Sequence, residues 1–154
     1  RNSKKGVKEI MPGIIKSIIP DSNAIIGVLR GDAQSIKTIK KAIKHGYEII
    51  ISEHVLYEVS KIEKDGQLRM MTWLIKQNPM KLTFTRDTKS VIETGEQLKN
   101  SFSFCHFPDN LILAQCKEQD SVLLTRDGKL LQSASYAGIM ACKPKDFGGF
   151  VSVS

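Results

Sequence analysis

Apolar residues recur along the chain with two different spacings. Short runs rich in β-branched residues predict buried strands, and longer stretches with apolar residues three and four positions apart predict helices with one buried face. Because strands and helices alternate through short connections, we predict an α/β fold of three layers, with a mainly parallel central sheet between helices. The expected strands are 14–20, 47–51, 81–85, 121–125 and 139–144, and the expected helices are 22–29, 33–44, 53–62, 67–77, 88–100, 110–118 and 129–138.

Two of these helices carry a clear apolar stripe, and the first of them follows Ser52, a suitable N-cap. The side chains expected on the two buried faces are Val55, Leu56, Val59 and Ile62, and Leu68, Met71, Leu74 and Ile75. Gly95 is expected to weaken helix 88–100. We predict one domain over residues 14–147, with a basic tail at 1–13 and a second tail at 148–154.

The tripeptide Thr-Arg-Asp follows an apolar run twice, at 85–87 and at 125–127. Strand 81–85 alternates apolar and polar residues, as expected near the margin of a sheet, whereas strand 121–125 holds consecutive apolar residues, as expected for a strand covered on both faces. Central strands deliver their carboxyl ends to the crevice where ligands bind in such folds. We therefore interpret Asp127 as a site residue and Asp87 as the N-cap of the following helix.

Acidic residues stand at several points that this fold would bring to one edge of the sheet. Asp21 and Asp127 follow expected strands, and Asp109 opens an expected helix after Pro108. Each also has a simpler interpretation, because aspartate is a common N-cap and Asp127-Gly128 is a common turn dipeptide.

Glu58 lies between Val55 and Val59, on or beside the buried stripe of its helix. A carboxylate there needs a partner, either a lysine or arginine or a cation shared with other carboxylates. Clustered carboxylates suit Mg²⁺ or Mn²⁺, ions that activate water and bind substrate phosphates.

The formal net charge is +7, and four lysines lie within residues 37–44. Such a surface suits a phosphate backbone, although it is also typical of a solvated helix face. The three cysteines, Cys105, Cys116 and Cys142, form no paired motif, which favours a reducing, intracellular location over a disulfide framework or a zinc ribbon. No apolar run is long enough for a membrane span.

Several enzyme classes lack their motifs in this chain. The stretch GDAQSIKT lacks the second glycine and the Gly-Lys pair of a phosphate-binding loop, and PDSNAI stands where a dinucleotide-binding fold has its glycines. No G-x-S-x-G elbow is present, and the three histidines are interpreted as surface or structural residues.

The ordered segments IIPDSNAII (18–26), ISEHVLYEVSK (51–61), FPDNLILAQC (107–116) and SVLLTRDGKLLQSASYAGI (121–139) resemble the PIN domain family. The resemblance covers about residues 14–147. It implies an α/β/α ribonuclease that uses Mg²⁺ or Mn²⁺, either as a toxin of the VapC type or as an RNA-processing enzyme. The alternative is an inactive PIN-like module that binds RNA or a protein.

On this resemblance the four metal-binding and catalytic acids are Asp21, Glu58, Asp109 and Asp127. Asn23, Ser52 and Thr125 match small polar positions that support the metal site. The residues expected to contact RNA are Arg30, Lys37, Lys40, Lys41, Lys44 and Arg126. The resemblance also implies a cytoplasmic homodimer that acts on single-stranded or structured RNA and pairs with an antitoxin-type partner.

Overall fold

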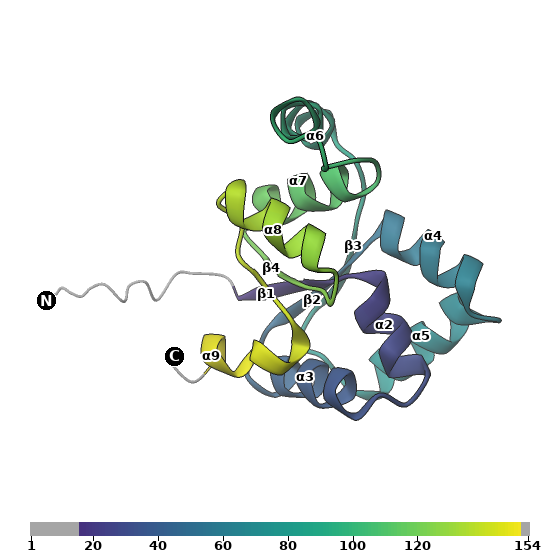
Figure 1. Ribbon diagram of the computed structural model, residues 1–154. Coiled ribbons are helices and arrows are strands. Elements are labelled where there is room, and N and C mark those ends of the chain that lie inside the picture. The colour runs from purple at the N-terminus through teal and green to yellow at the C-terminus, as the bar shows by residue number, and fades with distance from the viewer. Residues whose placement is uncertain (1–15, 152–154) are drawn as a thin grey trace, which may run out of the picture.

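The structure is a computed structural model that describes residues 16–151 (Figure 1). All strand pairings are parallel, and the sheet order is β3-β2-β1-β4-β5. The strands are β1 (Ser17–Pro20), β2 (Glu48–Ser52), β3 (Leu82–Thr85), β4 (Val122–Leu124) and β5 (Ala141–Cys142). The helices are α2 (Ser22–Leu29), α3 (Ala33–Lys44), α4 (Glu53–Ile62), α5 (Gly66–Lys76), α6 (Lys89–Ser101), α7 (Asp109–Gln119), α8 (Gly128–Tyr136) and α9 (Gly148–Val151), with a 3-10 turn, η1 (Pro144–Asp146). The predicted α/β class with a parallel sheet is confirmed.

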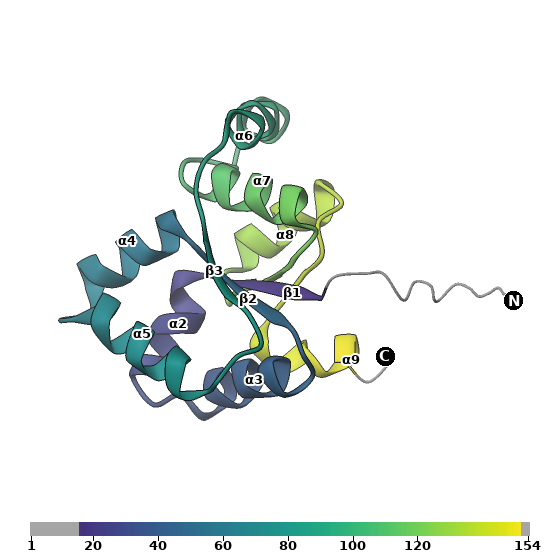
Figure 2. The ribbon, with the colours of Figure 1, turned by 180° about the vertical axis from the view of Figure 1, so that it is seen from behind.

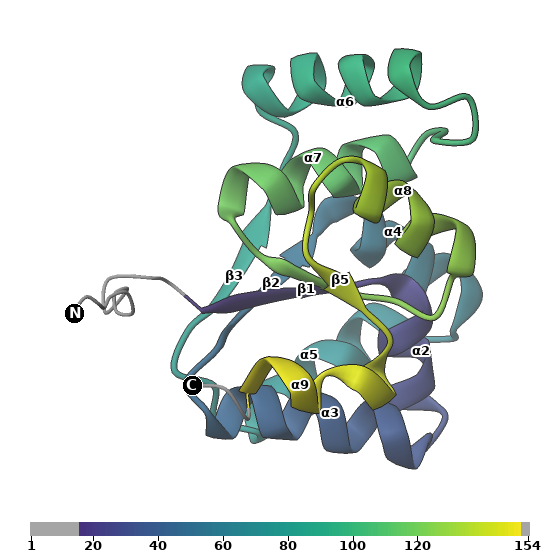
Figure 3. The ribbon, with the colours of Figure 1, turned by 60° about the vertical axis from the view of Figure 1, so that its left-hand side comes forward.

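Helices cover both faces of the sheet. Figures 1 and 3 show α7 and α8 on one face and α3 on the other, with α6 outside α7. The reverse view in Figure 2 shows the same outer position of α6. The helices α2 and α4 leave the carboxyl ends of β1 and β2, so that edge of the sheet is framed by helix starts.

Continuous apolar runs explain why β1, β2 and β4 form the interior of the sheet. Ile18 in β1, Ile49 in β2 and Leu123 in β4 have no solvent-exposed surface. Burying such a side chain stabilises the fold by roughly 1.5–3 kcal/mol each, and strands covered on both faces require apolar residues at successive positions. The predicted positions of the two Thr-Arg-Asp strands are confirmed, because β3 is an edge strand and β4 lies between β1 and β5.

The C-terminal end of the chain departs from the predicted boundaries, and the N-terminal boundary is not described. Residues 1–15, which include the predicted basic tail and the start of the first strand, lie outside the described residues. The last strand is shorter than predicted, since Pro144 lacks an N–H donor and begins η1 instead. The predicted tail at 148–154 begins with helix α9. Just before it, the buried Phe147 packs edge-on against Tyr47, with ring centroids 5.3 Å apart.

The predicted inner face of α5 was partly wrong. Leu68 and Ile75 are 69% and 61% exposed, whereas Met70 and Leu74 are buried. The buried side of α5 consists of Gly66, Met70 and Leu74, which are four residues apart. The helix is therefore turned about its axis so that a different face from the predicted one meets the core. In α4, Val55 and Val59 are buried as predicted, but Ile62 at the end of the helix is 49% exposed.

Gly95 has a packing role that its low helix propensity does not reveal. A Cβ atom at this position would lie 2.7 Å from Leu111 Cδ2 on α7, so glycine allows α6 to approach α7 closely. The Gly95 carbonyl also accepts a hydrogen bond of 3.1 Å from Asn110 Nδ2. This contact holds the outer helix on the domain.

Among residues 16–151, no helix is long and apolar enough to cross a membrane.

The close contact between α4 and α5 leads to a prediction about Gly66. A Cβ atom at Gly66 would lie 2.6 Å from the Val59 carbonyl oxygen, and a backbone atom cannot move away easily. We expect Gly66→Ala to lower the free energy of unfolding by about 1–3 kcal/mol despite alanine's better helix propensity. Urea denaturation measures this change. Gly128→Ala is the matched control, because a Cβ there meets nothing within 4 Å. Equal stability of the two variants would contradict the packing argument.

Candidate active site

Asp21 lies where β1 ends, in the N-cap position of α2, but its side chain makes no capping hydrogen bond there. Its Oδ2 atom instead accepts hydrogen bonds from Thr125 Oγ1 (2.8 Å) and Asn23 Nδ2 (3.2 Å). Burial raises the pKa of Asp21 above its usual value. Hydrogen bonds from Thr125 and the Ser22 backbone N–H lower it in part, and the charges of Glu58 and Asp127 raise it further. A residue that could have been only a helix cap is therefore an oriented, buried carboxylate.

Asn23 and Thr125 connect Asp21 to the segment that carries Asp127. Thr125 Oγ1 accepts hydrogen bonds from Asn23 Nδ2 (3.2 Å) and from the Asp127 backbone N–H (3.1 Å). Asn23 Oδ1 accepts the backbone N–H of Arg126 at 3.0 Å. Because Thr125 has no solvent exposure, these bonds hold the ends of β1 and β4 in one arrangement.

Glu58 extends from α4 towards the start of α2, where its Oε1 atom accepts a hydrogen bond of 2.8 Å from Ser22 Oγ. Within the part of the chain that the structure describes, it forms no ion pair with Lys61 or Lys64. The simple surface-pair interpretation of Glu58 is therefore wrong. Ser52 is fully buried and accepts the His54 backbone N–H at 3.2 Å, as the predicted N-cap of α4.

Asp127 is also the N-cap of α8, where its Oδ1 atom accepts the backbone N–H groups of Lys129 (2.9 Å) and Leu130 (3.4 Å). Asp109 is the first residue of α7. The pKa of Asp109 is raised from 3.8 to about 6, mainly by burial and further by the negative charges of Asp21, Asp127 and Glu58. The four predicted acids thus act on one another at the carboxyl edge of the sheet.

This cluster of Asp21, Glu58, Asp109 and Asp127, called the acidic cluster below, offers only carboxylate oxygens. In residues 16–151, no three of these carboxylates bring oxygens within 4.8 Å of one another. Hard oxygen donors that leave room for water suit Mg²⁺ and Mn²⁺, and a cation would relieve the repulsion that raises the pKa of Asp109. The donor set therefore fits a hydrated divalent cation.

Asp87, the other Thr-Arg-Asp aspartate, is not the predicted N-cap of α6. Thr88 caps that helix by accepting the Val91 N–H at 3.1 Å, one residue later than predicted. Asp87 instead accepts hydrogen bonds from His54 Nε2 (2.8 Å) and Gln115 Nε2 (2.9 Å). The prediction failed because both Asp87 and Thr88 are competent caps, and only the tertiary partners decide between them.

Sequence reasoning missed the group formed by Glu53, His54 and Asp87. One ligand atom from each lies within 4.8 Å of the others, and Glu53 Oε2 accepts the Asp87 backbone N–H at 2.7 Å. Both oxygens of Asp87 already accept side-chain hydrogen bonds, so the observed contacts tie the start of α4 to the end of β3. Glu53 and His54 directly follow β2. This position at the carboxyl end of a strand is the feature of the sequence that could have identified them as candidates.

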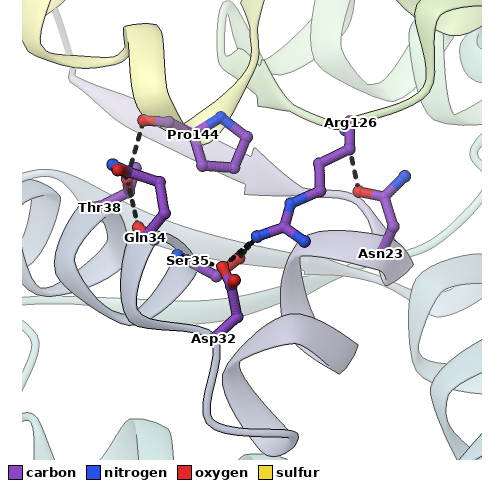
Figure 4. A network of polar contacts seen from close by, with 7 residues as sticks. All are labelled: Asn23, Asp32, Gln34, Ser35, Thr38, Arg126 and Pro144. Atoms are coloured by element: carbon purple, nitrogen blue, oxygen red, sulfur yellow. Dashed lines mark hydrogen bonds and ion pairs between the residues drawn. The ribbon is translucent and has the colours of Figure 1, made fainter.

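The basic residues expected around the site lie in two different settings. Arg30 pairs with Glu63 at 2.6 Å, and Arg126 pairs with Asp32 and donates to Ser35 Oγ at 2.8 Å (Figure 4). The lysines of α3 line a groove of about 730 Å³. Because α3 leads into the amino end of β2, Lys41 and Lys44 lie towards the opposite edge of the sheet from the acidic cluster. The α3 lysines therefore form a surface beneath the sheet and not a ring around the acids.

The profile of the PIN domain family matches residues 18–135. This chain belongs to the PIN domain family, whose members are typically nucleases and generally use divalent metal ions. A search of curated proteins gives no significant match.

Solved structures share the fold at low sequence identity. A toxin–antitoxin complex from Klebsiella pneumoniae contains a chain with a TM-score of 0.62 and 20% identity, which covers 83% of this chain and 98% of its own. For VapBC2 from Rickettsia felis bound to a promoter DNA fragment, the TM-score is 0.61, the identity 15%, and the coverage 82% and 97%. A domain of a functionally unknown protein from Methanocaldococcus jannaschii has a TM-score of 0.53, 22% identity, and coverage of 84% and 91%.

The raised pKa of Asp109 predicts a pH dependence of stability without divalent cations. The folded state holds this proton more tightly than the unfolded chain, so the free energy of unfolding falls as pH rises from about 4 to about 6. Asp109→Asn removes that penalty, and the variant should gain about 1–2 kcal/mol relative to wild type between pH 4 and pH 7, after discounting for partial exposure. Urea denaturation in EDTA at both pH values tests this. Parallel stability profiles for the two proteins would contradict it.

Proposed function

We propose that this chain is a metal-dependent endoribonuclease and that Asp21, Glu58, Asp109 and Asp127 hold Mg²⁺ or Mn²⁺. The observation that carries the proposal is that hydrogen bonds hold Asp21, Glu58 and Asp127 at the carboxyl edge of the sheet, with Asp109 at the start of α7 beside them. The pKa of Asp109, raised by burial and by the charges of the other three acids, supports this arrangement. Such a centre is costly unless a cation binds there, and strongly perturbed groups of this kind concentrate at functional sites.

The surrounding residues prepare this centre for phosphodiester hydrolysis. A bound divalent ion supplies an activated water and stabilises negative charge on the phosphate and the leaving oxygen. Thr125 and Asn23 hold the Asp21 carboxylate, and Ser22 holds Glu58. Asp127 is held by the backbone N–H groups of Lys129 and Leu130 in the first turn of α8. These carboxylates are oriented before any ligand binds, which lowers the cost of assembling the site.

The net charge of +7 supports RNA as the substrate, because phosphate backbones bind through lysine and arginine. We assign the first contacts outside the site to Arg30 and Arg126 and more distant ones to Lys37, Lys40, Lys41 and Lys44. The structural neighbours described as toxin–antitoxin complexes support an antitoxin-type partner. The homodimer is proposed from the resemblance to the family alone. Three buried free cysteines are consistent with action in the reducing cytoplasm. The alternative of an inactive binding module is less well supported, because all four acids are present and hydrogen bonds orient three of them, Asp21, Glu58 and Asp127.

Asp127→Asn separates catalysis from folding. Asparagine is as good an N-cap as aspartate, so the free energy of unfolding should stay within about 0.5 kcal/mol of wild type. Loss of the charge should reduce Mn²⁺-dependent cleavage of a labelled single-stranded RNA by at least about 100-fold. Asp120→Asn is the matched control, since Asp120 is exposed at the C-cap of α7 and asparagine tolerates its left-handed backbone. Cleavage by the Asp127 variant at the wild-type rate would exclude this residue from the site.

The α3 surface leads to a separate prediction about RNA affinity. Lys37 and Lys40 are exposed on α3. Replacing both with alanine should make RNA affinity less dependent on salt. The slope of log affinity against log salt concentration should fall by about 0.7 for each phosphate that these lysines neutralise. Fluorescence anisotropy with a single-stranded RNA and the inactive Asp127→Asn protein measures the slope. Replacing Lys89 and Lys99 on α6 is the control. An unchanged slope in the α3 variant would show that these lysines form only a solvated face.

A further inference from the structure

A hollow of about 450 Å³ lies directly beside the acidic cluster. Glu58 lines this hollow and also belongs to the cluster, so a molecule held by the cluster is next to the hollow. The other wall residues that matter are His54, Tyr57, Lys61 and Phe107. They come from α4 and from the segment that precedes α7.

Two aromatic rings face solvent at this hollow. Tyr57 and Phe107 are each 69% exposed, although both carry large apolar surfaces that folding would normally bury. One exposed aromatic residue needs no explanation, but two that line the same hollow beside a charged centre indicate a ligand. Lys61, also exposed, adds a positive charge to the same wall as Glu58.

The Phe107 side of the hollow is supported by contacts that reach into the core. The Phe107 ring packs nearly perpendicular to the His54 ring, with centroids 5.5 Å apart. His54 Nε2 is bonded to Asp87 at 2.8 Å, and Asp87 is bonded to Gln115, which has no solvent exposure, at 2.9 Å. A wall that is fixed before binding loses less entropy when a ligand arrives.

We propose that this hollow binds an unpaired nucleobase of the RNA, on a nucleotide adjacent to the phosphate held at the acidic cluster. This inference rests on the proposed ribonuclease activity. Aromatic side chains bind single-stranded nucleic acid by stacking on the faces of bases, and the hollow is within the size range of small-ligand sites. The Tyr57 hydroxyl and the second ring nitrogen of His54 provide polar groups for the base edge, and Lys61 suits the flanking phosphate. An apolar protein segment would leave these polar groups and Glu58 without matching partners.

The experiment measures binding separately from cleavage. A single-stranded oligoribonucleotide that contains 2-aminopurine is titrated in EDTA, and both anisotropy and the quenching of the base are recorded. We expect Tyr57→Ala and Phe107→Ala each to weaken binding by roughly 5- to 150-fold and to reduce the quenching, as loss of one stacked base predicts. Tyr57→Phe should retain the quenching because the ring remains. Phe84→Ala is the matched control, since Phe84 is 50% exposed on β3 and does not line the hollow.

The outcomes distinguish this proposal from the nuclease proposal. If both alanine variants bind the RNA with wild-type affinity and quench the base as strongly as the wild-type protein, the base site is overturned, whether or not the protein cleaves RNA. Quenching that is lost in both variants supports the base site even if no cleavage occurs with Mn²⁺, a result that would count only against the nuclease. Variants that change the oligomeric state on gel filtration while RNA binding stays at the wild-type level would identify the hollow as a protein contact and overturn the proposal.

Discussion

The site depends on the parallel pairing of β1 with β4. Because the two strands run in the same direction, the chain leaves both at one edge of the sheet, where the Asp21 backbone N–H donates to the Leu124 carbonyl at 2.8 Å. The next residue, Thr125, then reaches the Asp21 carboxylate and also accepts the Asp127 N–H. Without this register, the first and last acids of the cluster would not meet, and neither would be oriented.

Charge is distributed unevenly around this edge. Outside the cluster, some acids have cationic partners, as Glu63 has in Arg30 and Asp32 has in Arg126. The pKa of Asp32 is lowered, mainly by the backbone N–H and hydroxyl of Ser35 and further by Arg126, whereas the pKa of Asp109 is raised. Arg126 therefore connects the segment after β4 to the start of α3 (Figure 4), whereas no ion pair involves a member of the acidic cluster within the described residues. That difference supports the proposal that the cluster, and not its neighbours, binds a metal ion.

Asp87 and Asp127 follow the same tripeptide yet have different environments. Asp127 follows an inner strand and joins the acidic cluster, while Asp87 follows the edge strand and supports His54. The proposed base site depends on both residues. Asp127 belongs to the charged centre, and Asp87 holds His54, which packs against Phe107 in the wall of the hollow.

The sequence by itself determined the α/β class, the edge and inner positions of β3 and β4, and the four acids that the fold brings to one edge. These features follow from local periodicity and from the direction of parallel strands, both of which can be read along the chain. Only the tertiary structure decided which side of α5 is buried, that Thr88 and not Asp87 caps α6, and that His54 supports Phe107. Neighbouring residues there have similar intrinsic preferences, so contacts with distant segments make the choice. The close approach at Gly95 is of the same kind, because a missing side chain leaves no signal of what packs against it.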